Sequence, residues 1–325
     1  MTEPSLIAAH ADWSVDPRKR QVSIARCHAG IWHAEAPVPV GDPATLVRRL
    51  LAEGAPLALG LDLPMGLPRS YAAARPESGF LPFLRGMAGM AGMAGFFDVA
   101  AGLEDVSPAR PFYPARGVKG MTRAAHAAAL GMAGAGGLSR LCDLATTERP
   151  AGAPLFWTLG ANQTGKAAIS AWRDWLSPAL AAGAPYRIWP FEGGLRELLV
   201  LGVAVLAETY PAEAMRHLGI RLSGSKRARA ARQEAAPSLH LAMQRLGVCP
   251  APALGRALED GFGTDAVGED RFDSLLGLLC VVGVLAGARP DFVPDDPWLR
   301  SWEGWVLGQT AVPVHPAPIP YAGGL

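Results

Sequence analysis

The 325-residue chain lacks the features that mark secreted, zinc-binding and membrane-spanning proteins. Its N-terminus has neither the basic segment nor the long apolar core of a signal peptide. The longest apolar run, residues 274–288, is about 15 residues long, whereas a span across a bilayer needs roughly 18. The cysteines form no C-x-x-C pair, which argues against a zinc site or a disulfide framework; they are Cys27, Cys142, Cys249 and Cys280. We therefore expect a cytoplasmic protein with no membrane partner.

An excess of charge of one sign is also missing. The 30 lysines and arginines nearly balance the 29 acids, and the net charge is +1. No overall field would attract a polyanion, so a nucleic-acid partner would have to bind a local basic patch. The seven histidines form no H-x-x-x-H or H-E-x-x-H pattern, and G-x-S-x-G is absent. Zinc-protease and serine-hydrolase chemistry therefore have no support in the sequence.

One glycine-rich stretch resembles a phosphate-binding loop but is incomplete. Residues 160–166, GANQTGK, follow the pattern G-x-x-x-x-G-K, in which backbone N–H groups and the lysine bind phosphate. The next residue is Ala167, where the pattern requires a Ser or Thr hydroxyl for a magnesium ion. We therefore do not expect an NTPase loop. Lys166 is still a candidate contact for a substrate phosphate, and the alternative is a solvated lysine at a helix start.

Hydrophobic patterning predicts an α/β fold. Strands at 6–12, 21–27 and 31–36 precede a helix over 42–54, and a further strand follows at 57–68. This order predicts a meander, and then a crossover that returns parallel to the first strand. Later strands are expected at 186–193 and 203–211, and helices at 166–181, at 226–247 on either side of Pro237, and at 269–287.

A recurring pattern places an acid at the end of an apolar strand. It occurs at Asp12, Asp62 and Glu208, while Asp273 lies at the start of the most apolar helix with Asp270 one turn earlier. An unpaired charge within such a strand would cost several kcal/mol, so several of them suggest a shared cation. Carboxylates without a His or Cys partner favour Mg²⁺ or Mn²⁺, which can activate a water for phosphoryl transfer. The alternative is a set of separately satisfied structural acids.

The motifs around these acids resemble a known family. The Asp-Trp-Ser strand end at 12–14, L-D-L-P-M-G-L-P at 61–68, E-T-Y-P at 208–211 and D-R-F-D-S-L-L at 270–276 are similar to a family of predicted RNase H-like nucleases, classified as a domain of unknown function. The segments FWTLGANQTGKAA at 156–168 and WEGWVLGQ at 302–309 also resemble that family. The order and spacing of the motifs, from about residue 5 to about residue 310, carry the resemblance.

The resemblance implies a fold and a site. It implies one RNase H-like domain over 1–325, with a mixed five-stranded sheet, helices on both faces and an insertion over 69–184 that holds a Met-Ala-Gly repeat. The first and fourth strands would be parallel neighbours. The resemblance further implies that the catalytic, metal-binding acids are Asp12, Asp62, Glu208 and Asp273.

The run 221–233, RLSGSKRARAARQ, is the strongest local concentration of positive charge. Its Lys226 and Arg227 are candidate contacts for an anionic substrate, and a solvated helix face is the other interpretation. His10 would share a strand face with Asp12, either near a metal centre or as a packed core histidine.

These observations support a metal-dependent nuclease or phosphodiesterase that acts on nucleic acid or another phosphodiester. A non-catalytic binding or scaffold protein is the alternative, favoured if the acids lie apart or each has its own Lys or Arg. A third hypothesis is an ATP-dependent phosphotransferase, because actin-like kinases share a related core. That hypothesis is weakened because Asp12 is followed by Trp13 and Ser14 and not by a Gly-rich D-x-G-x-x-[ST] loop.

Overall fold

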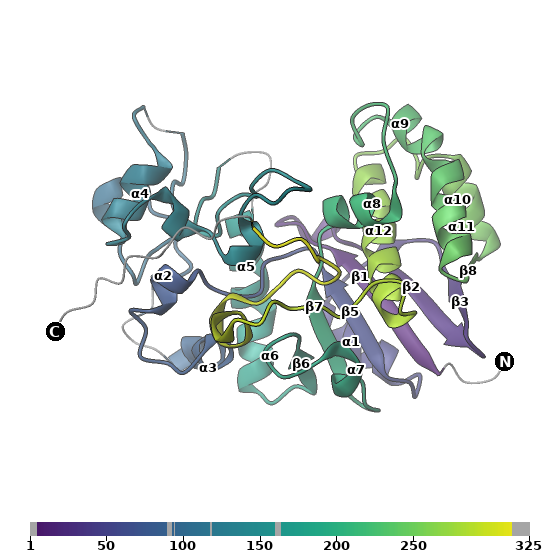
Figure 1. Cartoon of the computed structure of the whole chain (residues 1–325), viewed down its shortest axis with the longest axis horizontal. Helices are drawn as coiled ribbons and strands as arrows, with labels where there is room; N and C mark the ends of the chain where they lie inside the picture. The colour runs from purple at the N-terminus through teal and green to yellow at the C-terminus, as the bar shows by residue number, and fades with distance from the viewer. Residues whose placement is uncertain (1–4, 90–92, 94, 118, 160–163, 314–325) are drawn as a thin grey trace. The chain divides into compact units, whose positions relative to one another are not determined.

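The structure is a computed structural model, and it describes residues 5–89, 93, 95–117, 119–159 and 164–313 (Figure 1). The chain forms two units, each assembled from separate stretches of sequence. Unit 1 comprises residues 1–63, 185–292 and 306–310, and unit 2 comprises residues 64–184, 293–305 and 311–325. The segment 69–184, for which we predicted an insertion, therefore lies within unit 2.

Unit 1 is built on one mixed β-sheet of eight strands. The strand order is β6-β7-β5-β1-β2-β3-β8, and β4 pairs with β2 outside this path. β1 is antiparallel to β2 and parallel to β5, which is in turn parallel to β7. The strands are β1 (Leu6–Asp12), β2 (Gln21–His28), β3 (Ile31–Ala34), β4 (Val38–Pro39), β5 (Leu57–Leu61), β6 (Tyr186–Ile188), β7 (Ala204–Glu208) and β8 (Val248–Pro250).

The predicted α/β class, meander and parallel return of the fourth strand are confirmed, but the sheet is larger than the five strands expected. The additional strands include β4 and β8, which have two and three residues. Segments this short carry no readable hydrophobic period, so their pairing is determined by the rest of the fold.

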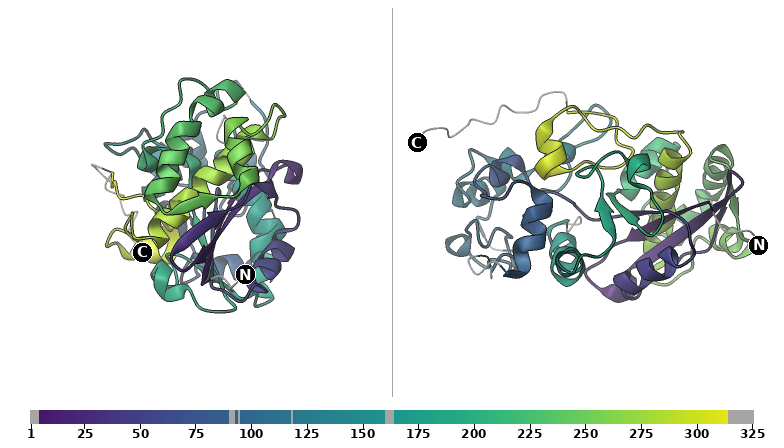
Figure 2. Two further views of the ribbon diagram at one scale, coloured as in Figure 1. Left: turned by 90° about the vertical axis from the view of Figure 1, so that its right-hand side faces the viewer. Right: turned by 90° about the horizontal axis from the view of Figure 1, so that it is seen from below.

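Two helices cover opposite faces of the sheet (Figure 2). The first, α1 (Pro43–Leu51), begins at Asp42, whose side chain accepts a hydrogen bond from the Thr45 N–H at 2.8 Å. The second, α12 (Gly268–Leu285), lies against β1, β2 and β5 with nearly all of its residues buried. No helix in the described residues combines the length and apolarity needed to cross a membrane.

The remaining helices of unit 1 are short. The predicted helix over 226–247 begins at Arg229, three residues later than expected, because the carbonyls of Lys226 and Arg227 accept hydrogen bonds from the Arg232 side chain and not from the backbone N–H groups of a following helical turn. The helices are α7 (Leu195–Leu198), α8 (Pro211–Leu218), α9 (Arg229–Glu234), α10 (Ala236–Arg245) and α11 (Pro252–Glu259), with a 3₁₀ turn at Pro17–Lys19.

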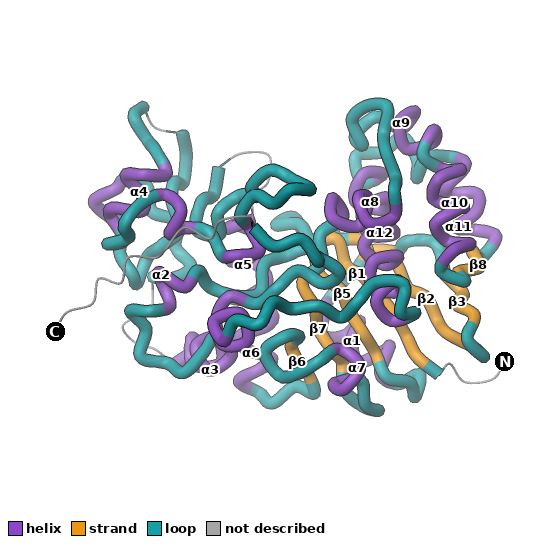
Figure 3. The backbone as a smooth tube through the Cα atoms, viewed as in Figure 1, coloured by secondary structure: helices purple, strands orange, loops and turns teal. Residues whose placement is uncertain are grey.

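Unit 2 has little regular structure beyond short helices (Figure 3). Its core contains edge-to-face aromatic contacts, including Phe83 on Phe96 and Phe112 on Phe156. The predicted helix over 166–181 is confirmed as α5 (Thr164–Ala171), a π-helical turn (Trp172–Leu176) and α6 (Ser177–Ala181). Its other α- and π-helices are α2 (Arg69–Ala72), α3 (Phe80–Gly86), α4 (Arg123–Ala129) and the π-helical turn Leu299–Glu303.

Candidate functional site

Strand register brings two of the predicted acids side by side. Ala11 of β1 is paired with Leu61 of β5, so Asp12 and Asp62 are the next residues of two parallel neighbours. The Asp62 N–H donates to the Ala11 carbonyl at 3.1 Å, which continues the pairing to the acids. Asp12 is buried, and the two carboxyl groups share a hydrogen bond.

Helix α12 adds two carboxyl groups on the same face of the sheet. His10 shares the face of Asp12 and packs against Gly277 of α12, so this helix covers that face. Asp270 shares a hydrogen bond with Asp12, and the buried Asp273 acts electrostatically on Asp12 and Asp62. We call these four residues the carboxyl cluster: Asp12, Asp62, Asp270 and Asp273.

The structure does not bring Glu208 into the carboxyl cluster. β7 pairs with β5 so that Glu208 lies opposite Leu61 and not opposite Asp62. Because side chains alternate between the faces of a strand, the register assigns Glu208 to the face opposite that of Asp12. Glu208 is fully buried, and its charge contributes to the raised pKa of Asp62. Of the four acids expected to converge, Asp12, Asp62 and Asp273 do so.

Burial is the main cause of raised pKa values throughout the cluster. It raises the pKa of Asp12 well above its usual value, helped by the charges of Asp273 and Asp62. It raises the pKa of Asp62 to about 7, with Asp273 as the next cause, and that of Asp273 to about 6. The pKa of Asp270 is raised to about 6 in the same way. The cluster therefore carries more potential negative charge than its surroundings neutralise.

Two buried oxygen atoms of the cluster have no hydrogen-bond partner among the described residues: Asp273 Oδ1 and Asp270 Oδ2. Such atoms lose hydration without compensation, which makes them candidate ligands for a cation. In the part of the chain that the structure describes, Asp12, Asp62 and Asp273 do not bring three oxygens within 4.8 Å of one another. The acids thus lie on the side of the sheet that α12 covers, but their oxygens do not form a compact set of metal ligands.

Among the residues that the structure describes, one lysine pairs with an acid of the cluster. Lys226 Nζ pairs with Asp273 Oδ2, and it lies 4.0 Å from Glu269 Oε1. Its charge also lowers the pKa values of Asp12 and Asp62. Burial opposes the charged form of Lys226, but Asp273 and Asp62 outweigh burial and raise the pKa of its ammonium. Lys226 is therefore part of the cluster and not of a solvated helix face.

Arg232 fixes the backbone that carries Lys226. The Arg232 guanidinium is buried and donates to the carbonyls of Lys226 at 2.6 Å and Arg227 at 3.0 Å. It also donates to the carbonyls of Gly261 at 2.8 Å and Gly263 at 2.9 Å. The basic run thus divides by role, because Arg232 holds the loop, Lys226 enters the cluster, and Arg227 lies at the surface 3.5 Å from Glu269.

His10 is a packed core histidine. Its ring is fully buried, and Nδ1 lies 3.2 Å from the Ser274 carbonyl oxygen. A Cβ added to Gly277 would lie 2.2 Å from the ring, and one added to Gly60 would lie 2.9 Å from it. Burial lowers the pKa of His10 to about 3, so the ring is neutral and supplies no positive charge to the neighbouring acids.

The other predicted phosphate contact belongs to unit 2. Lys166 lies in the first turn of α5 and is partly exposed. Residues 160–163 of the incomplete phosphate-loop pattern lie outside the described residues.

Sequence reasoning missed one further cation, Lys19. It is exposed in the turn between β1 and β2, and its charge lowers the pKa of Asp270. The signal was present in the sequence, because the connection to the antiparallel strand β2 begins directly after Asp12 and ends at Gln21, which pairs with Asp12.

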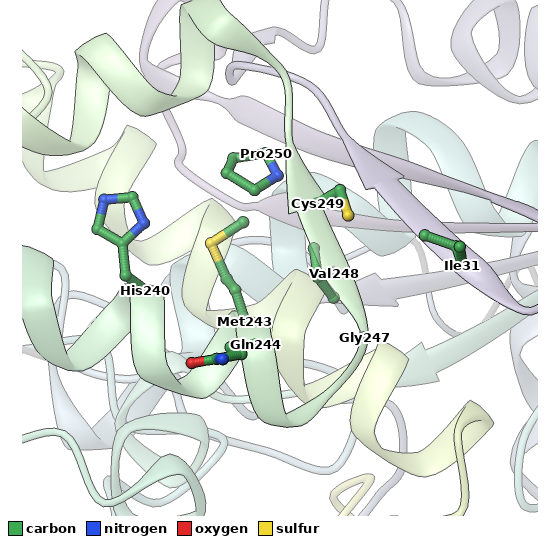
Figure 4. Close-up of a pocket in the computed structure, with 8 residues that line it drawn as sticks. All are labelled: Ile31, His240, Met243, Gln244, Gly247, Val248, Cys249 and Pro250. Carbon is green, nitrogen blue, oxygen red and sulfur yellow. The ribbon is translucent and has the colours of Figure 1, made fainter.

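A separate pocket of about 500 Å³ lies at the edge of unit 1 (Figure 4). It is formed by α10 and β8, with His240 and Met243 on one side and the exposed Cys249 on the other. No acidic or basic side chain other than His240 lines it. The pocket therefore offers little to a phosphodiester, and the carboxyl cluster is the stronger candidate.

Comparison with known proteins identifies no matching family model, no matching curated protein and no matching solved structure.

Proposed function

We propose that unit 1 is a metal-dependent phosphodiester hydrolase, a nuclease, with an RNase H-like arrangement of its sheet. The observation that carries the proposal is the carboxyl cluster at the ends of β1 and β5 under α12, whose four carboxyl groups outnumber the one lysine, Lys226, that pairs with them among the described residues. The sheet order supports the fold, because β1 is antiparallel to β2 and parallel to β5.

The cluster fits a hard divalent cation. Its donors are carboxylate oxygens, which Mg²⁺ and Mn²⁺ prefer, and the buried Asp273 Oδ1 is unpartnered. When bound, such an ion activates a water and stabilises charge on the leaving oxygen. Asp12 and Asp62, on the sheet face that α12 covers, and Asp273, on α12 itself, would hold it.

The residues of the chain would contribute in distinct ways. Asp12 and Asp62 are fixed by strand pairing, so their carboxyl groups stay close without a flexible loop. Lys19 is exposed and electrostatically coupled to Asp270, so it is placed to attract a substrate phosphate. Lys166 and Arg227 remain proposed substrate contacts, and the substrate would be nucleic acid or another phosphodiester.

A non-catalytic binding or scaffold role is the second candidate, and the Lys226–Asp273 pair is the observation in its favour. That role predicts that each acid has its own cation. Within the described residues, no Lys or Arg lies within 4.0 Å of the Asp12 or Asp62 carboxyl oxygens. This difference favours the hydrolase.

Calorimetric titration with Mn²⁺, run on the wild type and on Asp62→Asn, tests the proposed function. We expect the wild type to bind Mn²⁺ and to cleave a DNA or RNA substrate, and Asp62→Asn to lose both while staying folded. Asp265→Asn is the matched control, because Asp265 is an exposed acid of the same unit that pairs with Arg271. Turnover retained in Asp62→Asn, or no Mn²⁺ binding by the wild type, would overturn the proposal.

A further inference from the structure

Lys226 has an environment unlike that of a substrate-binding lysine. A lysine that contacts a mobile substrate extends into solvent, but two thirds of the Lys226 side chain is covered and its ammonium pairs with Asp273. Asp62 and Glu269 act on the same ammonium. The lysine therefore stands where a bound cation would be stabilised.

Hydrogen bonds from Arg232 hold the backbone at Lys226 in place. The buried Arg232 donates to the carbonyls of both Lys226 and Arg227, so the loop backbone cannot shift without breaking hydrogen bonds to a charged donor. The same guanidinium is held in turn by two carbonyls of the segment that leads into α12, Gly261 and Gly263. The ammonium is therefore a fixed charge rather than a flexible one.

Lys226 leaves part of the cluster open. It pairs with Oδ2 of Asp273, while Oδ1 of the same carboxylate is buried and unpartnered. Asp12 and Asp62, on the neighbouring strands, share a hydrogen bond with each other and not with the lysine. One oxygen of Asp273 is thus neutralised by Lys226, and its other oxygen, like the Asp12 and Asp62 carboxyl groups, pairs with no Lys or Arg in the described part of the chain.

We propose that Lys226 permanently fills one of two cation positions in the carboxyl cluster, so that unit 1 takes a single divalent ion. This inference rests on the proposed function, because it assigns the number of metal ions at the same site. The lysine ammonium supplies the fixed positive charge that a second ion would otherwise supply. Lys226 is then a positioning residue for the Asp273 carboxylate and not a contact for substrate.

The test is the number of Mn²⁺ ions bound per chain, measured by calorimetry and by electron paramagnetic resonance of free Mn²⁺. We expect one ion for the wild type and two for Lys226→Met, which keeps the apolar stem but frees Asp273 Oδ2. Arg227→Met is the matched control, because the side chain of the neighbouring Arg227 is 79% exposed and pairs with Glu269, which is not a member of the carboxyl cluster. It should bind one ion.

Every other count of bound Mn²⁺ ions contradicts a stated proposal. Two ions in the wild type, or one ion in Lys226→Met at any affinity, would overturn the role of Lys226 and leave the proposed hydrolase intact. No Mn²⁺ binding by any variant would overturn the metal-dependent function and this inference together. If Lys226→Met does not fold, Lys226→Arg retains the charge and must still bind one ion; a count of two would then refute the inference.

Discussion

The two units bury carboxyl groups in opposite ways. In unit 2, Asp143 is covered by the Arg140 guanidinium at 3.0 Å, and Glu303 is covered by Arg69 at 2.6 Å. In unit 1, the acids of the carboxyl cluster share Lys226 as their one close cation among the described residues. A buried acid with its own arginine becomes destabilising when that arginine is removed, whereas acids in excess of their cations already cost stability, which is typical of functional sites.

The largest effect should come from removing a dedicated cation in unit 2. Arg140→Met leaves Asp143 buried and uncompensated, so we expect a loss of about 3–5 kcal/mol in unfolding free energy. Denaturant unfolding measures it. Arg173→Met is the control, because both partners of the Arg173–Asp174 pair are about half exposed and such pairs contribute about 0–1 kcal/mol. Equal losses for the two variants would remove the contrast between the units.

A smaller effect, of opposite sign, should follow from removing charge in unit 1. The folded state raises the pKa of Asp62 from 3.8 to about 7 through burial, so folding favours its protonated form. That contribution to stability is complete below about pH 4 and is lost as pH rises through 7. The pKa shift of Asp62 corresponds to about 4 kcal/mol of folding free energy for a fully buried group. Because Asp62 is partly exposed, solvent screening reduces this contribution to on the order of 2–3 kcal/mol.

Asp62→Asn removes this titration, so the variant should be more stable than the wild type at pH 8 and not at pH 4. Denaturant unfolding in EDTA at both pH values checks the prediction. Parallel pH profiles for the two proteins would show that the Asp62 carboxyl is solvated and that the units do not differ as described.

The smallest effect concerns the packing that holds the acids in unit 1. A methyl group at Gly277 would lie 2.2 Å from the His10 ring, so Gly277→Ala should destabilise the protein by about 1–3 kcal/mol. Gly283→Ala in the same helix meets nothing closer than 3.8 Å and should stabilise it by about 0.5–1 kcal/mol. Thermal unfolding distinguishes the signs. A neutral Gly277→Ala would mean that α12 tolerates displacement from β1.

The sequence could predict those parts of the site that follow from local pattern. Asp12 and Asp62 were predicted as neighbours because an acid follows each apolar strand and a crossover makes the strands parallel. Asp273 followed from its place at the start of the apolar helix. Each of these inferences needs only the order of elements and not the details of packing.

The rest depended on register and on distant contacts. Glu208 follows the same strand pattern, but its pairing with Leu61 assigns it to the other face, and a change of one residue in register would reverse that. Lys226 and Arg232 looked like one basic helix face. Their separate roles arise from Asp273 and from the carbonyls of Gly261 and Gly263, which no local pattern specifies.

The docking of α12 on β1 joins His10 to Ser274, which are 264 residues apart in the chain. β1 and β5 both precede α12 in the chain, and α12 is the element that brings Asp270 and Asp273 to Asp12 and Asp62. Closure of α12 over the sheet therefore adds two acids to the repulsion that strand pairing already creates between Asp12 and Asp62. We therefore expect the first turns of α12 to open locally more easily than the rest of the sheet region in alkaline solution. As pH rises, amide hydrogen exchange should accelerate in these turns before it does in the central strands.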